Sequence, residues 1–595
     1  MERAEDRNQD TGAGISSAPV RSPASPSLLP EDPKEAEQVF NALSPQEQFD
    51  LLLQARAKER LHYLFLSRNP EQIVQQLPEL EVFLTIKEIG DRDALSLISL
   101  VTPEQFQFVL DLDFWKRDEL DPEKILHWLE ILLECGEKKI AQFIQSTDPE
   151  FIALLFKKFL HVTTLEGEPL EAVEKVPAFT LDQYYFVHFT GKETRAIAEP
   201  FLKIYSLIHP EGYQRLMEAL IWELDSGLEE TEYRIRNARL SEYGFPDFEE
   251  ALEIYRFIHP DSLISKGKTP PLAKQEESEK SRPTFYLAFP EEGPFFSAIL
   301  AKVDNPQRRD RLKLEMTALC NRAMVAEATD LSRFEEIERI TKKVFHYLNL
   351  GLQYLSRQEE TRALEILHSV PLQRLFQCAV SLTLLLKRKG ETLLKGPWFE
   401  GKLENLLFLD PPYLERFEGI LKKRPGLHRD GKVGDFKNLR ELKETENIVE
   451  TVETVVDFLG KHLNVSPGYL KNLALMGCHP EDWREITLST LFLTALANQV
   501  LKGSFRFEAI EKGQLNDLFS RMFEKSEQGK GVIRMEIRNG LKDWIASIED
   551  DENKRDHLLA FRDFCLDLLE LEFGKMGSGE GIDPRFVKGL LIRGL

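Results

Sequence analysis

Cysteine is scarce in this chain: five cysteines are spread over 595 residues, and no two of them form a Cys-x-x-Cys pair. An odd and scattered set favours neither a disulfide framework nor a cysteine-rich zinc site. We therefore expect each cysteine to act as a small apolar residue on a helix.

The chain also lacks a long hydrophobic run. Its longest uncharged apolar stretch, near residues 375–386, covers about a dozen residues, whereas a helix needs about 20 to span a bilayer. The N-terminal residues, from Met1 to Asp6, contain no apolar segment of the kind that a secretory signal requires. We therefore expect a cytoplasmic protein with no membrane span.

Positive charge is outnumbered, with 77 Lys and Arg against 100 Asp and Glu and a formal net charge of −23. A generally acidic surface repels phosphate, which disfavours general nucleic-acid binding and binding to anionic membranes. A local basic patch escapes this argument.

Recognisable catalytic motifs are missing as well. The sequence has no G-x-x-x-x-G-K-[ST] phosphate loop and no kinase, zincin or EF-hand pattern. The glycine-rich run 577–581 lacks a lysine and does not match the G-x-S-x-G nucleophile elbow, so we interpret it as a flexible connector. The sequence therefore identifies no catalytic residue and no cofactor.

Two Glu-x-x-His pairs, Glu59 with His62 and Glu365 with His368, match the motif that helical di-iron proteins use. Matches of this kind are expected by chance in a glutamate-rich chain with 12 histidines. The two pairs are far apart in the sequence and their flanks differ. We therefore predict no metal site and keep a metal-binding bundle through His62 and His368 as the third of three hypotheses.

What the sequence does contain is a recurrent helix-start pattern. A small polar residue is followed by Pro and then by an acid or amide, which suits the N-cap, the first helical position and the positive end of the helix dipole. The pattern predicts a mostly α fold of short helical hairpins stacked into a superhelix, with at most a few short strands. It occurs in Ser44-Pro45-Gln46, Asn69-Pro70-Glu71, Thr102-Pro103-Glu104, Asp121-Pro122-Glu123 and Asp148-Pro149-Glu150.

A clearer repeat follows. The stretch 202–211 is echoed by 252–261, with Leu, Ile, Tyr, Ile, His and Pro matching at one offset. We expect a duplicated helical unit of about 50 residues. The histidines before the prolines, His209 and His259, with His479 as a third, are possible metal ligands or pH-sensitive groups, but a helix end explains them better.

Composition divides the chain further. The Pro- and Ser-rich start is typical of a disordered tail, and two aromatic segments, 178–189 and 284–289, read as short strands, with a helix still open for the first. We expect an apolar last helix from Asp583 to dock onto the protein body. The predicted regions are a tail (1–34), a superhelix (35–160), duplicated units (161–265), a linker (266–283), a middle helical region (284–409), a basic loop region (410–445) and a C-terminal helical domain (446–595).

The basic loop is the local charge anomaly. Between residues 422 and 440 seven cations face two acids, in a chain that is acidic overall. Such a patch suits an anionic ligand, an acidic partner surface or nucleic acid, while the alternative is a solvated loop that pairs with the chain's own acidic helices. The candidate contacts are Lys422, Lys423, Arg424, Asp435, Lys437 and Arg440.

At this point the ordered chain resembles a family of long bacterial proteins that is catalogued as a domain of unknown function. The resemblance rests on Thr102-Pro103-Glu104-Gln105-Phe106, the two Ile-His-Pro stretches, Gly434-Asp435-Phe436 and the terminus Ile582-Asp583-Pro584-Arg585-Phe586-Val587. That family has no established activity, so the resemblance implies no function. More distantly, residues 69–160 resemble the superhelical cytoplasmic domain of bacterial magnesium transporters and of the flagellar motor switch protein, which implies an architecture only.

Three functions remain open on the sequence alone. The first is an interaction or scaffold protein that holds another protein on extended helical surfaces. The second is an enzyme whose site is assembled from distant residues, with the loop near Asp435 and the aromatic segment near Tyr184 as candidates for its pocket. The third is the metal-binding bundle. Partner identity and oligomeric state are left open.

Overall fold

The computed structural model describes residues 29–573 and 587–594, except for 31, 56, 117, 165–177, 224, 266–291, 430, 474, 476 and 526–530. Within these residues the chain forms 27 α-helices, and its strands are short and lie in sheets of two or three. The predicted mostly α fold is therefore confirmed.

The first ten helices lie in the region predicted as a superhelix, and every helix start predicted there is confirmed. Ser44, Thr102, Asp121 and Asp148 each accept a backbone N–H from the first turn, whereas Asn69 makes no such bond. The helices are α1 Pro33–Ala42, α2 Pro45–Gln54, α3 Ala57–Leu66, α4 Pro70–Val74, α5 Glu79–Ile89, α6 Leu95–Ile98, α7 Pro103–Asp113, α8 Pro122–Cys135, α9 Glu137–Ser146 and α10 Pro149–Lys157.

Two antiparallel hairpins interrupt these helices. β1 (Trp115–Lys116) pairs with β2 (Glu119–Leu120), and β3 (Leu160–Thr164) pairs with β4 (Tyr185–Phe189). The first aromatic segment therefore contains a strand. The second, 284–289, lies outside the described residues, as do the linker, the glycine-rich run and most of the tail. The tail prediction ran slightly too far, because α1 begins at Pro33.

The two Ile-His-Pro stretches differ in conformation. In the first, α11 (Lys192–Ile208) ends at His209 and α12 (Pro210–Trp222) begins after it. In the second, α14 (Phe248–Leu252) passes into a 3₁₀ turn, η1 (Glu253–Tyr255), and then into non-helical chain. The expected duplicated helix is thus absent from the second stretch. α13 (Asp225–Ser241) lies between them and α15 (Ser262–Ser265) follows.

His209 caps a helix, as the sequence favoured. Its Nδ1 accepts the backbone N–H of Gly212 at 3.2 Å. We expect His209→Ala to lower the free energy of unfolding by about 1 kcal/mol, the usual net worth of one such bond. His259→Ala is the matched control, because His259 is exposed and caps no helix. Chemical denaturation followed by circular dichroism compares the two, and equal losses would contradict the capping role.

The middle helices lead into a long connecting helix. They are α16 Pro294–Ala301, α17 Pro306–Ala326, α18 Phe334–Ser356, α19 Glu360–Ser369 and α20 Leu372–Lys395, followed by the 3₁₀ helix η4 Leu403–Phe408. No single helix in the described ranges is long and apolar enough to cross a membrane. Only the pair α19 and α20, bent by 118°, meets that requirement of length and composition together.

The remaining chain forms the arm. Its helices are α21 Pro411–Ile420, α22 Leu439–Leu463, α23 Pro467–Asn472, η5 Trp483–Glu485, α24 Leu488–Lys502, η6 Lys512–Gln514, α25 Leu515–Met522, α26 Met535–Ile548 and α27 Glu552–Phe573. Its strands are β5 Leu427–Arg429, β6 Lys432–Gly434, β7 Cys478–His479, β8 Ile510–Glu511, β9 Phe523–Lys525, β10 Gly531–Ile533 and β11 Ile592–Arg593.

The predicted basic loop region is more ordered than a loop. It contains helix α21, because Pro411 and Pro412 occupy the first helical positions, where their missing N–H groups cost nothing. It also contains the β5–β6 hairpin, in which Leu427 pairs with Gly434. The prediction of a loop region over 410–445 is therefore wrong for these two parts.

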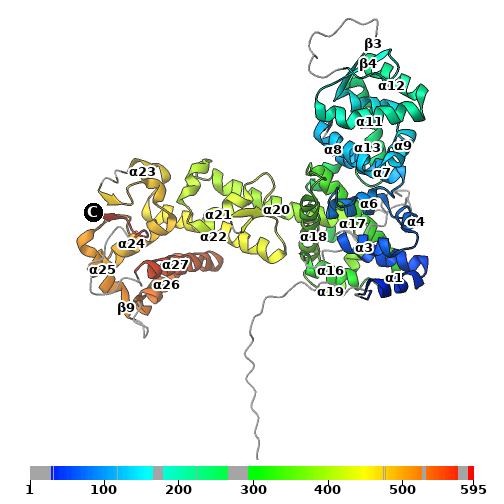
Figure 1. Cartoon of the computed structure of the whole chain (residues 1–595). Helices are drawn as coiled ribbons and strands as arrows, with labels where there is room; N and C mark the ends of the chain where they lie inside the picture. Colours follow the sequence, from blue (N-terminus) through cyan, green and yellow to red (C-terminus); the bar gives the residue numbers. More distant parts are fainter. Residues whose placement is uncertain are drawn as a thin grey trace, which may run out of the picture.

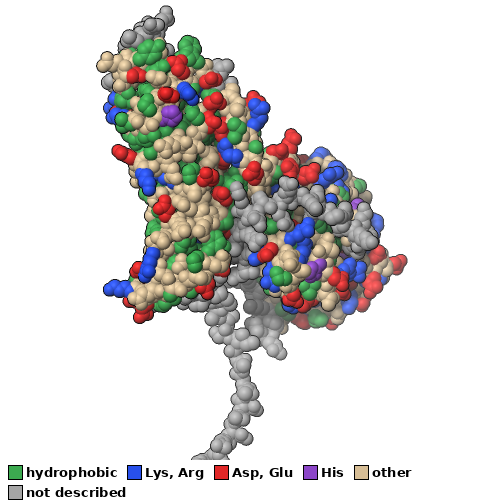
Figure 2. Space-filling view, turned by 90° about the vertical axis from the view of Figure 1, so that its right-hand side faces the viewer, with side chains coloured by type: hydrophobic (Ala, Val, Ile, Leu, Met, Phe, Trp, Pro, Cys, Tyr) green, Lys and Arg blue, Asp and Glu red, His purple; other side chains and the backbone are tan. Residues whose placement is uncertain are grey.

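The molecule is bent, with two lobes (Figure 1). Helices α1–α19 form an upright lobe, and α20 leads from it into the arm, which carries α21–α27. On the face shown in Figure 2, acidic and basic side chains are interspersed, so no large field of one sign covers it. The place where arm and upright lobe meet is called the elbow below.

The C-terminal segment docks as a strand. β11 lies between β7, to which it is antiparallel, and β8, to which it is parallel. Val587, Leu590, Leu591 and Ile592 are buried. Docking of the apolar tail is confirmed, but residues 587–594 form no helix. The predicted start of the last helix, Asp583, lies outside the described residues.

All five cysteines are described and none is in a disulfide. Four of them are on helices and Cys478 is on β7. Every one except Cys135 is buried, which agrees with the role of a small apolar residue.

Candidate functional site

The six candidate residues lie between the end of α21 and the first turn of α22, but they have different environments. Lys422 and Lys423 are exposed at the end of α21, and Lys437 and Arg440 are exposed around the start of α22. Arg424 and Asp435 are half-buried. The structure therefore divides the predicted patch into exposed cations and a pair that faces the protein interior.

Arg424 and Asp435 belong to a buried charge cluster, here called the Lys343 cluster (Tyr255, Glu327, Lys343, Arg424 and Asp435). The Lys343 ammonium, whose side chain is 4% exposed, lies 2.6 Å from Glu327 Oε1 and 3.4 Å from Asp435 Oδ1. Glu327 also pairs with Arg424 and accepts the Tyr255 hydroxyl. The guanidinium of Arg424 stacks 4.4 Å from the Tyr255 ring centroid.

The charges in this cluster neutralise one another. Burial alone would raise the pKa of Glu327, but the Lys343 ammonium, the Tyr255 hydroxyl and Arg424 together hold that pKa below its ordinary value. Burial, with the negative charge of Glu327, raises the pKa of Tyr255 well above its ordinary value. Glu327 is thus ionised and Tyr255 neutral, so the cluster is a saturated set of ion pairs.

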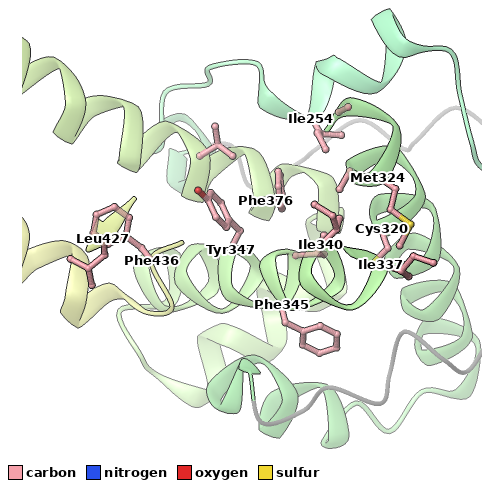
Figure 3. Packing of buried hydrophobic residues seen from close by; sticks show 14 of the residues in the cluster. Ile254, Cys320, Met324, Ile337, Ile340, Phe345, Tyr347, Phe376, Leu427 and Phe436 are labelled. Atoms are coloured by element: carbon pink, nitrogen blue, oxygen red, sulfur yellow. The ribbon is translucent and has the colours of Figure 1, made fainter. Parts of the chain in front are cut away.

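Apolar contacts hold the same segment from the other side. Leu427 on β5 and Phe436 just after β6 are buried, and Figure 3 shows them side by side at the end of the helix that carries Tyr347. Arg424 also donates to the carbonyl of Ala326 at the end of α17. Arg424 and Asp435 therefore fix the hairpin on α17 and α18, which is a structural role.

A cleft of about 550 Å³ lies at the elbow. One wall comes from the upright lobe and the other from the segment around the start of α22. The lining residues are Glu292, Pro294, Asn349, Gln353 and Gln358 on the first wall and Lys437, Asn438, Leu439, Arg440, Lys443, Glu444 and Asn447 on the second. Two candidates from the sequence, Lys437 and Arg440, line this elbow cleft, whereas Lys422 and Lys423 do not.

Hydrogen bonds between the walls fix the floor of the elbow cleft. The Asn349 amide donates to the Lys437 carbonyl at 3.0 Å, and its oxygen accepts the backbone N–H of Phe296 at 3.1 Å. The Gln353 side-chain oxygen accepts the backbone N–H of Leu439 at 2.8 Å. These bonds join α16, α18 and α22, so the cleft is preformed.

The acids of the cleft are already paired. Glu292 lies 2.7 Å from His346 Nε2, and Glu444 lies 2.7 Å from Arg440. Burial lowers the pKa of His346 despite this hydrogen bond, so the imidazole is neutral near pH 7. Burial would raise the pKa of Glu292, but the hydrogen bond from His346 and the charge of Lys437 lower it.

Other sequence candidates are not brought to this cleft. Tyr184 is exposed beside β4, at the end of the upright lobe away from the elbow (Figure 1). Among the residues that the structure describes, no group of three or more His, Cys, Asp and Glu side chains is placed to hold a metal ion, and His62 on α3 and His368 on α19 form no shared site.

A family model for a family of unknown function, DUF6178, matches residues 37–593. The chain belongs to this family. The resemblance to an uncharacterised family is thereby confirmed for the DUF6178 chain. No curated protein and no solved structure matches it, so the more distant resemblance to magnesium transporters and the motor switch protein stays a prediction.

Sequence reasoning missed most of the cleft of this DUF6178 protein. Asn349, Gln353, Lys443 and Asn447 were not among the candidates. One signal was available: two carboxamides four positions apart, Asn349 and Gln353, share one face of α18.

Proposed function

We propose that this protein is a cytoplasmic interaction protein that binds a partner protein in the elbow cleft. The observation that carries the proposal is a preformed cleft whose two walls contribute five side-chain carboxamides. Its volume of about 550 Å³ is that of a small-molecule pocket, roughly 300–1,000 Å³, so the cleft holds a segment of the partner and not its whole surface. Carboxamides donate and accept hydrogen bonds without titrating, which suits recognition better than proton transfer.

The arrangement of charge supports binding rather than catalysis. The acids near the cleft, Glu292 and Glu444, are each bonded to a neighbouring base. The Lys343 cluster is buried behind the hairpin and saturated by its own members. A general acid or base needs an available group within hydrogen-bond reach of the substrate, and neither set supplies one.

An affinity pull-down from the native cell extract tests this function. The tagged wild type is compared with Asn447→Trp, which fills the cleft from an exposed position of α22. Glu453→Trp is the matched control, because Glu453 is exposed on the same helix and does not line the cleft. We expect one protein near stoichiometry with the wild type and the control, and at least tenfold less with Asn447→Trp.

The recovered protein is then identified by mass spectrometry, purified and rebound to the three variants. Circular dichroism checks that each variant is folded. Equal recovery with Asn447→Trp would show that the partner binds outside the cleft. If no protein is enriched at moderate salt, the proposed interaction function is wrong.

A further inference from the structure

The two walls of the elbow cleft present rows of polar side chains along helix faces. On α18, Asn349 and Gln353 are four positions apart, and on α22 Arg440, Lys443 and Asn447 are three and four positions apart. These are the spacings of neighbours on one helix face. From 440 to 447 a helix rises about 10 Å, the length of about three residues of extended chain.

The free hydrogen-bonding capacity in the cleft is mainly that of donors. The Gln353 side-chain oxygen accepts the backbone N–H of Leu439, and that of Asn438 accepts the backbone N–H of Glu441. The NH₂ groups of both side chains therefore remain available as donors. In the described part of the chain these NH₂ groups have no partner, and neither do the side chains of Gln358 and Asn447. An occupant that satisfies this set must be rich in acceptors.

The free charge in the cleft is positive. Arg440 is paired with Glu444 and Lys437 lies 3.9 Å from Glu292, whereas Lys443 is exposed and has no ion pair among the described residues. The lining therefore carries three cations against two acids in a protein whose net charge is −23. An acidic occupant is repelled by the rest of the surface and attracted here.

We infer that the partner segment held in the elbow cleft is an extended acidic peptide. The inference rests on the proposed function and names its ligand. The peptide's backbone carbonyls accept from the carboxamides of both walls, and its carboxylates lie against Lys443, Lys437 and Arg440. The row along α22 spans several residues, so a chain fills the cleft better than one isolated anion.

Fluorescence anisotropy with a labelled hexapeptide of alternating Glu and Asp tests the inference on the full chain. We expect saturable binding that weakens with added salt, and a loss of about tenfold in Lys443→Glu, because a charge-assisted hydrogen bond is replaced by repulsion. Lys422→Glu is the matched control: it makes the same charge change at an exposed lysine outside the cleft, and we expect less than a twofold change.

Three further arms separate the sources of binding. Equal affinity for a Gln-Asn hexapeptide would overturn the acidic specificity. If free glutamate or inorganic phosphate competes at the same concentrations as the unlabelled hexapeptide, the ligand of the cleft is a small anion and not a peptide. If no hexapeptide binds while Asn447→Trp still loses the recovered partner, the inference fails and the proposed function stands.

Discussion

Replacing Lys343 by methionine lowers the free energy of unfolding by about 3 kcal/mol. The side chain is almost wholly buried and its ammonium pairs with Glu327 and Asp435, so its removal leaves the buried Glu327 and the half-buried Asp435 short of a positive charge. Methionine fills nearly the same volume, which keeps cavity formation out of the comparison. The measurement is chemical denaturation followed by circular dichroism.

The matched control is Lys342→Met, one position away on α18. The Lys342 side chain is 36% exposed, and its ion pairs with Glu292 and Glu338 are 3.9 and 3.5 Å long. Exposed pairs of this kind contribute less than about 1 kcal/mol. If the two variants unfold at the same denaturant concentration, burial of the Lys343 cluster does not stabilise the fold. A double variant with Glu327→Gln should cost less than the sum of the single changes.

The helix starts were predictable because their cause is local. Thr102 caps α7 through the N–H of Gln105, and the Gln105 side chain bonds back to the N–H of Thr102. All the atoms involved lie within four consecutive residues, so the sequence contains the whole interaction. The same holds for His209 and Gly212.

The rule that Pro marks the first position of a helix was not applied to residues 411 and 412. Pro411 and Pro412 begin α21 as Pro103 begins α7, yet we predicted a loop region from residue 410. The repeat of Leu, Ile, Tyr, Ile, His and Pro failed for the opposite reason. The residues match, but Gln377 donates to the carbonyl of Glu253 and Ser381 accepts the N–H of Ile258, so contacts with α20 hold the second stretch in another conformation.

The roles of the basic residues depend on partners far away in the sequence. Arg424 bonds to the carbonyl of Ala326, 98 positions earlier, and Lys343 reaches Asp435 across a similar interval. The sequence of the segment 422–440 does not distinguish Arg424, which is half-buried and bonds to Ala326, from Lys422, which is exposed. Charge counting could therefore locate the segment but not separate structural cations from those that line the cleft.

Deleting residues 587–595 unfolds the arm. Four buried apolar side chains of this segment, at about 1.5–3 kcal/mol each, contribute about 6 kcal/mol or more, which is comparable to the whole stability of a domain. The deletion also removes β11, the central strand between β7 and β8, and the N–H of Leu591 that Thr494 accepts. Limited proteolysis mapped by mass spectrometry should show rapid cleavage within residues 411–573 and slower cleavage of the upright lobe.

Arg593→Ala is the control at an exposed position of the same segment. The Arg593 side chain is 60% exposed and its distance to Glu511 is 4.0 Å, so we expect a change of less than about 0.5 kcal/mol. Leu590→Asp, at a position that is fully buried, should instead reproduce the cleavage pattern of the deletion, because a carboxylate cannot be buried there without a partner. If the deleted protein keeps a protease-resistant arm, the segment only covers a core that is complete without it. If the arm is digested, this terminal strand is part of the core that holds α22, and with it the second wall of the elbow cleft, in place.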